Sequence, residues 1–151
     1  MPAMVAKQAV IRPLAEEDWP LLRQMYQTYQ PLEVSLGLPP RDAARRDAWL
    51  ENLKTGINLT ALVEGRTAGH LVLMPGRNSA EMAVFVHQDY RRQGIATALT
   101  RMAVEETRKL GLHSLWVLIS SDNNPARAGL LKFGFHTAWE SMGEVKMVYR
   151  L

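Results

Sequence analysis

The sequence contains no cysteine, which excludes disulfide bonds, thiolate metal sites and a cysteine nucleophile among its residues. It also lacks clustered histidines. His70, His87, His113 and His136 are scattered without the spacing of metal ligands, so no metal site is expected. No apolar run is long enough to cross a bilayer, and residues 1–13 hold no signal-like apolar core. We therefore expect a cytoplasmic protein that does not bind a membrane.

A strong excess of one charge is also lacking. The 18 Lys and Arg residues and 15 Asp and Glu residues give a net charge of +3. This small excess favours an anionic partner and makes a nucleic acid an improbable one. With 151 residues, 47% of them hydrophobic and 22% charged, the chain has the composition of one globular domain spanning residues 1–151.

Hydrophobic periodicity predicts a strand, two helices, three strands, a helix, a strand, a helix and two strands. The segments are 9–12, 19–29, 41–56, two strands of a hairpin around Gly65, 80–87, 95–110, 114–120, 124–133 and two closing strands around Gly143. This order predicts an α/β (α+β) fold, a mixed sheet of six to seven strands with about four helices on its two faces. The nearly unbroken apolar run 114–120 predicts a strand that is covered on both faces.

One stretch of the sequence has the pattern of an anion site. In "VFVHQDYRRQGIATALTRMAVEE" an apolar strand enters a turn that brings Gly94 and Ala96 to the start of a long helix. Helix N-termini present free amides, small residues admit a ligand close to the backbone, and Arg91 and Arg92 add charge suited to phosphate. The alternative is that Gly94 only opens the turn and both arginines are solvated. No P-loop and no Gly-x-Gly-x-x-Gly after a first strand is present.

The residues of this stretch resemble those of the GNAT superfamily of acetyl-CoA-dependent N-acetyltransferases. Its Arg/Gln-x-x-Gly-x-Gly/Ala signature is similar to "RRQGIA" at 91–96, and a second block of the family is similar to "NPARAGLLKFGF" at 124–135. The resemblance implies a splayed sheet in which the strands "MAVFV" and "LWVLIS" diverge around the pantetheine arm of acetyl-CoA. The coenzyme-binding residues that it implies are Phe85, Val86, Arg91, Arg92, Gln93, Gly94, Ile95, Ala96, Thr97, Asn124 and Arg127.

Three positions depart from the family pattern. Gln88 replaces a proline that is usual after the first of these strands, which alters the stiffness of the loop. Leu130 stands where the family usually has a tyrosine that protonates the leaving thiolate, and Gly129 precedes it in place of a leucine. A thiolate leaves with little help at neutral pH, since the pKa of a thiol is about 8.5. Tyr149, Ser120 and Ser121 are alternative acids, and each has an ordinary structural explanation as well.

Acetyl transfer to an amine also requires a base, because a primary ammonium has a pKa of about 10. The resemblance implies Glu81 at the start of a strand as the base, acting through water, and an oxyanion donor among the amides of 84–86. The alternative is that Glu81 is only a solvated glutamate at a strand end. The resemblance also implies an acceptor site formed by the segment that connects the first two helices and by the last hairpin. The substrate-binding candidates are Tyr26, Tyr29 and Glu33, with Glu140 and Glu144 as further acidic lining.

The sequence therefore predicts transfer of acetyl from acetyl-CoA to a primary amine by direct attack in a ternary complex. A small-molecule amine is favoured, and a protein or aminoacyl-tRNA acceptor is the alternative. Because of Leu130, a coenzyme-A-binding module with little turnover is a second hypothesis. The run "VKMVYRL" at 145–151 predicts either a homodimer contact or a central strand.

Overall fold

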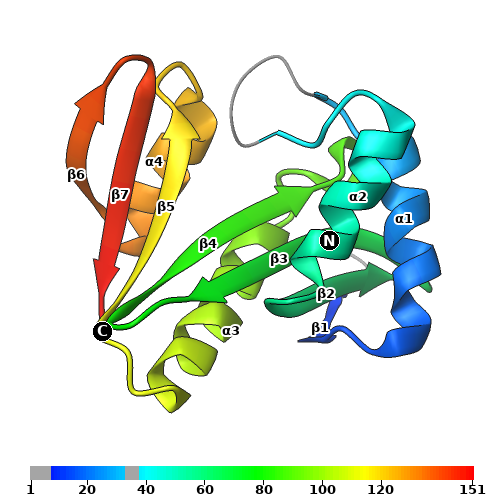
Figure 1. Ribbon diagram of the computed structural model, residues 1–151, viewed down its shortest axis with the longest axis horizontal. Coiled ribbons are helices and arrows are strands. Elements are labelled where there is room, and N and C mark those ends of the chain that lie inside the picture. The colour runs from blue at the N-terminus through cyan, green and yellow to red at the C-terminus, as the bar shows by residue number, and fades with distance from the viewer. Residues whose placement is uncertain (1–7, 33–37) are drawn as a thin grey trace, which may run out of the picture.

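The computed structural model of the protein describes residues 8–32 and 38–151, and these form a seven-stranded sheet with helices on both faces (Figure 1). The strands are β1 (Val10–Pro13), β2 (Ile57–Val63), β3 (Arg66–Pro75), β4 (Ser79–Val86), β5 (Ser114–Ser120), β6 (His136–Ser141) and β7 (Glu144–Arg150). The helices are α1 (Trp19–Gln27), α2 (Ala43–Leu53), α3 (Ile95–Lys109) and α4 (Asn124–Phe133), with 3-10 turns η1 (Glu16–Asp18) and η2 (Gln88–Tyr90). The predicted fold class and element order are confirmed.

The sheet opens in its middle, between β4 and β5. The strand order is β1-β2-β3-β4-β5-β7-β6, and β4–β5 is its one parallel pair. These strands pair only where Ser79–Glu81 meets Ser114–Trp116, and beyond that point they diverge in a V (Figure 1). The predicted splayed sheet is confirmed. In a parallel pair both strands end on the same side, so the helices that follow β4 and β5 begin near the mouth of the V.

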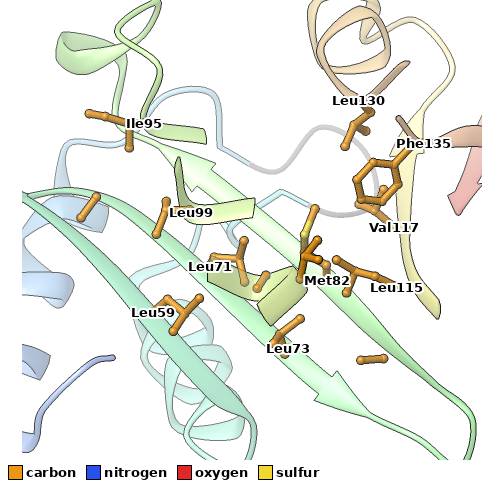
Figure 2. Close-up of a cluster of buried hydrophobic side chains, with 14 of the residues drawn as sticks. Leu59, Leu71, Leu73, Met82, Ile95, Leu99, Leu115, Val117, Leu130 and Phe135 are labelled. Atoms are coloured by element: carbon orange, nitrogen blue, oxygen red, sulfur yellow. The ribbon is translucent and has the colours of Figure 1, made fainter. Parts of the chain in front are cut away.

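Helices pack on both faces of the sheet, and each face has its own hydrophobic core. On one face, α1 and α2 pack on β4 through an aromatic-rich cluster that contains Leu22, Tyr26, Leu50 and Phe85. On the other face, α3 and α4 pack on the strands through a larger aliphatic cluster, drawn in Figure 2. Gly69 on β3 lets α3 lie close, since a Cβ there would stand 3.0 Å from the Ile95 side chain.

Two expectations about the C-terminal strands are resolved by the sheet. Strand β5 was predicted to be covered on both faces, and this is wrong: Leu115 and Val117 are buried, but Trp116 between them and Leu118 after them are partly exposed. The cause is that, among the described residues, helices pack on only one face of this part of the sheet, where α3 and α4 lie. Strand β7 lies between β5 and β6, so within the chain it is a central strand and β6 is the sheet edge.

Helix α1 is shorter than predicted and ends at Gln27, two residues before Tyr29. Its start is fixed by Asp18 in the preceding 3-10 turn, whose carboxylate accepts a hydrogen bond from Arg12 on β1 (3.0 Å to Oδ1). This hydrogen bond from Arg12 lowers the pKa of the nearly buried Asp18 carboxyl. No helix within the described residues has the length and apolarity to cross a membrane, and no group of three His, Asp or Glu there is placed to bind a metal.

Candidate active site

The N-terminus of α3 presents free amides to open space. Gly94 caps the helix in the left-handed conformation (φ +81°) and has no side chain to satisfy the first amides. The first helical bond runs from Ala98 N–H to the Gly94 carbonyl (3.0 Å), so the amides of 94–97 have no protein acceptor in the described part of the chain. A Cβ on Gly94 would meet no atom within 4 Å. These four amides, here called the cradle, fit an anion at the positive end of the helix dipole.

The residues around the cradle differ in what they can offer to a ligand. Ile95 is buried in the core, so it offers only its amide. Arg92, Gln93, Ala96 and Thr97 are exposed, and Arg92 holds a positive φ of 64° in the turn. Arg92 is therefore an exposed arginine next to the cradle, and its side chain forms no hydrogen bond with the described residues.

Arg91, by contrast, points its side chain toward the end of α1. Its Nε donates to the Val86 carbonyl (2.8 Å), and one terminal nitrogen donates to the Gln30 carbonyl. The guanidinium also lies over the Tyr29 ring, 5.4 Å from the ring centre. A phosphate contact of Arg91 is therefore available through its amide, whereas its side chain binds the protein itself.

The free edge of β4 lines the gap beyond the last β4–β5 pair. His87 N–H donates to the carbonyl of Ala68 on β3 (2.9 Å). Main-chain groups alternate in direction along a strand, so those of Phe85 point toward β3 and those of Val84 and Val86 point into the gap. The Phe85 ring packs between α1 and α2. The main-chain donors available in the gap are therefore the N–H groups of Val84 and Val86.

A groove of about 730 Å³ runs between α3 and α4 on the same side of the sheet as the cradle. It is lined by Thr97, Arg101, Val104, Glu105 and Arg108 of α3, by Gly129, Lys132 and Phe133 of α4, and by Tyr149 of β7. Three of these side chains are cationic and one is anionic, which suits an elongated anionic ligand. The exposed Gly129 leaves this wall of the groove without a side chain.

Asn124 and Arg127 lie on α4, across the gap from the cradle. Asn124 is exposed in the first turn of the helix, which is capped by the side chain of Asn123 (3.3 Å to Ala126 N–H). Arg127 forms an ion pair with Glu140 of β6 (2.8 Å), and this hydrogen bond lowers the pKa of the Glu140 carboxyl. In this structure Arg127 therefore braces α4 against the edge strand.

Leu130 packs into the core that joins α4 to the diverging strands. Its side chain is 9% exposed and lies beside Phe135 and Val117 (Figure 2). Among the candidate acids, Tyr149 lines the α3–α4 groove and packs against Phe133 and Phe135. The Ser120 hydroxyl donates to Asp122 (2.6 Å). Of the alternative acids, Tyr149 is therefore the one that lies beside the α3–α4 groove.

Glu81 lies at the point where β4 and β5 part. It occupies the last paired position, opposite Trp116 of β5 and Met74 of β3, and is partly buried. Ala83 and Phe85, which follow it at two-residue spacing, pack on the α1–α2 cluster. The Glu81 side chain is therefore on the α1–α2 face of the sheet, opposite the α3–α4 groove.

Tyr26 is fully buried in a chain of polar contacts. Its hydroxyl lies 2.8 Å from His70 Nδ1, and His70 Nε2 lies 2.7 Å from the side-chain oxygen of Asn58. The Asn58 amide nitrogen donates to the Leu53 carbonyl (2.8 Å), so we assign the proton of His70 to Nε2 and the Tyr26 hydroxyl as donor to Nδ1. Burial lowers the pKa of His70 to about 3. Tyr26 therefore links α1 to β3 and leaves no free polar atom for a substrate.

The two other substrate candidates lie at or beyond the end of α1. Tyr29 is 5% exposed and contacts the rings of Tyr26, Phe85 and His87. Its burial raises the pKa of its hydroxyl. Glu33 lies outside the described residues.

Sequence reasoning missed two features near the gap. Gln88, treated there only as a loop residue, bonds twice to the end of α1 through contacts that span 58 and 60 residues of sequence. The face of β5 and β7 away from α4 carries Trp116, with Lys146 Nζ 4.4 Å from its ring centre. Strand alternation could have placed Trp116 and Lys146 on one face, but no local signal identifies the partner of Gln88.

The family model of the acetyltransferase (GNAT) family matches residues 19–135. The match covers well over half of the chain, so the protein belongs to the GNAT acetyltransferase family. Its cradle and second block, at 91–96 and 124–135, lie inside or at the border of the matched region.

Several solved structures have the same fold as this chain. A ribosomal-protein-alanine N-acetyltransferase from Brucella melitensis is 26% identical, with a TM-score of 0.73 over 94% of this chain and 99% of that one. The GNAT domain of PAT from S. lividans is 18% identical, with a TM-score of 0.79 over 95% and 90%. The yncA protein from Salmonella typhimurium, solved with its cofactor acetyl-CoA, is 19% identical, with a TM-score of 0.73 over 95% and 94%.

Proposed function

We propose that the protein transfers an acetyl group from acetyl-CoA to a primary amine by direct attack in a ternary complex. The observation that carries this proposal is the gap between β4 and β5, which has a cradle of free amides at its mouth and a basic groove along one side. The family membership adds the reaction type, acetyl transfer.

The donor set of the gap fits coenzyme A. The amides of 94–97 would hold the pyrophosphate, with the Arg91 amide and the Arg92 side chain beside them. The pantetheine arm, which carries amides, would meet the gap-facing main chain of Val86. Asn124 would approach it from α4. The α3–α4 groove would hold the remaining anionic part of coenzyme A.

The chemistry needs a base, a donor for the oxyanion and a leaving group. Bound acetyl-CoA supplies the electrophilic thioester carbonyl. We assign Glu81 as the base that takes the amine proton through water, and the N–H of Val84 or Val86 as the donor to the carbonyl oxygen. Leu130 cannot donate a proton, so the thiolate leaves unassisted or takes a proton from Tyr149.

The acceptor would approach from the α1–α2 face, where Glu81 lies and where none of the described helices packs on β5. A small-molecule amine would fit beside the partly buried carboxylate of Glu81, at the point where β4 and β5 part. A protein acceptor is the second candidate, supported by the 26% identity to a ribosomal-protein-alanine N-acetyltransferase and by the open face around Trp116. We include both classes in the test.

The first experiment is calorimetric titration of acetyl-CoA into the protein, followed by assays of amine-dependent CoA release. The panel should contain polyamines, amino acids, aminated metabolites and a peptide with an N-terminal alanine. Micromolar binding with turnover on any of these amines would support the proposal. Micromolar binding with no turnover on any amine would favour a coenzyme-binding module instead, and no binding would overturn both.

The role of Glu81 is tested by Glu81→Gln against Glu16→Gln, an exposed glutamate in the first 3-10 turn. Loss of a general base lowers kcat/KM by about 100-fold at pH 7. The defect should shrink as the pH approaches the amine pKa of about 10, because the amine then needs no base. A defect of the same size at every pH would contradict the assignment.

A further inference from the structure

Two loops that are remote in sequence are tied together beside the cradle. The first is the end of α1, residues 28–30, and the second follows β4, residues 86–91. Gln88 accepts a hydrogen bond from the Gln30 N–H (2.9 Å) and donates one to the Thr28 carbonyl (2.6 Å). A single side-chain amide thus binds one main-chain donor and one main-chain acceptor of the same turn.

Arg91 ties the same turn from the other end of the loop. Its guanidinium bridges the Val86 carbonyl and the Gln30 carbonyl, and it stacks on Tyr29. Gln30 is therefore held at its N–H by Gln88 and at its carbonyl by Arg91. We call this pair of side chains the loop clamp.

His87 adds a third contact between the two loops. The Asp89 N–H donates to His87 Nδ1 (3.2 Å), so the proton lies on Nε2, which donates to the Thr28 hydroxyl (2.9 Å). Because His87 directly follows β4, the turn after α1 is fixed relative to the strand that lines the gap.

We propose that the loop clamp of Gln88 and Arg91 couples the coenzyme cradle to the end of α1, and that Arg91 is a positioning residue for the acceptor side. This inference rests on the proposed function, which places the acceptor on the α1–α2 face. Anion binding at 94–97 orders the loop that carries both clamp residues. An ordered clamp in turn holds residues 28–30, so acetyl-CoA and the acceptor bind cooperatively, and the coupling acts equally in both directions.

The geometry separates this role from that of a phosphate ligand. Lysine also binds phosphate, as a point charge, so it retains the charge contribution of a phosphate-binding arginine. The clamp needs a planar fork that reaches two carbonyls while lying on a ring, which lysine cannot supply. Arg92, one residue away and exposed, carries the same charge without clamp contacts and gives a matched comparison.

The experiment compares Arg91→Ala, Arg91→Lys, Gln88→Ala and Arg92→Ala in the full chain. Hydrogen exchange of the Gln30 amide is measured with and without acetyl-CoA, together with the Kd of acetyl-CoA and the KM and kcat for the best amine of the panel. In the wild type, saturating acetyl-CoA should slow exchange at Gln30 at least fivefold. Circular dichroism confirms that each variant is folded.

The clamp predicts that Arg91→Ala and Gln88→Ala raise the acceptor KM about tenfold and abolish the slowing at Gln30. The Kd of acetyl-CoA should change less than threefold in these variants, and Arg91→Lys should behave like Arg91→Ala. Arg92→Ala should show the reverse pattern, a weaker Kd with protection at Gln30 retained. The two clamp substitutions should be less than additive, since both act on Gln30.

Two results overturn the inference in distinguishable ways. If wild-type protein binds acetyl-CoA and exchange at Gln30 does not respond, or if Arg91→Ala weakens only the Kd and Arg91→Lys restores it, the coupling is wrong and the proposed function stands. If wild-type protein does not bind acetyl-CoA, the proposed function fails and the coupling fails with it.

Discussion

The two arms of the V-shaped sheet differ in how many of their faces are covered by helices and in which residues they place at the gap. The arm of β1–β4 is covered on both faces, by α1 and α2 on one and by α3 on the other. Within the described residues, the arm of β5, β7 and β6 is covered on one face only, by α4 and part of α3, and its other face exposes aromatic side chains. The arms share one short parallel pairing.

The two arms therefore differ in role: the first supplies groups that bind the ligands, and the second supplies the candidate proton donor for the leaving thiolate. The first arm carries the cradle and the gap-facing amides of β4, which depend on main-chain geometry, and the loop clamp, which ties two loops beside them. The second arm carries Leu130, Tyr149 and Arg127, whose contributions depend on side chains. Substitutions in the first arm should therefore change ligand binding strongly, and substitutions in the second should change turnover or have small effects.

The largest expected effect comes from Gly94→Asp, which puts a negative charge at the cradle. We expect the Kd of acetyl-CoA to rise at least 100-fold, about 2.7 kcal/mol. Gly65→Asp is a matched control, because Gly65 has a similar φ of 78° and equally open surroundings in the β2–β3 turn. Calorimetry measures both. Equal losses in the two variants would indicate general strain and would contradict the anion cradle.

The second effect concerns the stability of the first arm. Burial depresses the pKa of His70 from 6.5 to about 3, so below pH 6.5 the unfolded chain takes up a proton that the folded chain refuses. The free energy of unfolding should fall by about 1.4 kcal/mol per pH unit from this group, roughly 2 kcal/mol by pH 5. Urea denaturation between pH 7 and pH 4 measures it. His70→Gln should flatten the slope, and an unchanged slope would assign it to other groups.

The third effect tests the second arm through its missing acid. Leu130→Tyr should raise kcat about tenfold below pH 8, because a phenol can then protonate the leaving thiolate. Leu130→Phe, which adds the ring without the hydroxyl, is the control. A gain that appears in both variants would come from repacking. If Tyr149 already serves as the acid, Tyr149→Phe lowers kcat in the parent and much less in Leu130→Tyr.

The smallest effect is expected at Arg127. Because its guanidinium is paired with Glu140 at the protein surface, Arg127→Ala should weaken acetyl-CoA binding less than threefold and change the stability of the fold little. Glu140→Ala removes the ion-pair partner of Arg127 and is therefore the variant to compare with Arg127→Ala. Tighter coenzyme binding in Glu140→Ala, lost again in the double variant, would reassign Arg127 to the coenzyme.

The fold was largely predictable from local patterns. Alternation and helical spacing identify the elements, and glycine signals place the hairpin at Gly65 and the cap at Gly94. The exception is β5, where an apolar run suggested burial on both faces. An apolar run is equally compatible with one buried face and one aromatic face, and only the count of covering helices distinguishes the two.

The candidate site was predictable where it depends on main-chain geometry and less so where it depends on side chains. The motif at 91–96 places the cradle by itself, because a strand, a turn and a helix start are contiguous in sequence. The directions of Arg91 and Tyr26 depend on partners that lie 61 and 44 residues away, Gln30 and His70. A side chain with several rotamers takes its direction from such neighbours, which no local pattern contains.

The sequence by itself determined the element order, the amide cradle at the start of α3 and the replacement of the usual tyrosine by Leu130. Each of these is a local property, fixed by spacing, by a glycine or by residue identity. Only the tertiary structure decided where β4 and β5 part, that Arg91 turns to the end of α1, and that Tyr26 is sealed in a buried polar chain. Those features arise from packing between segments remote in sequence, where the final neighbours of a side chain are set by the fold as a whole.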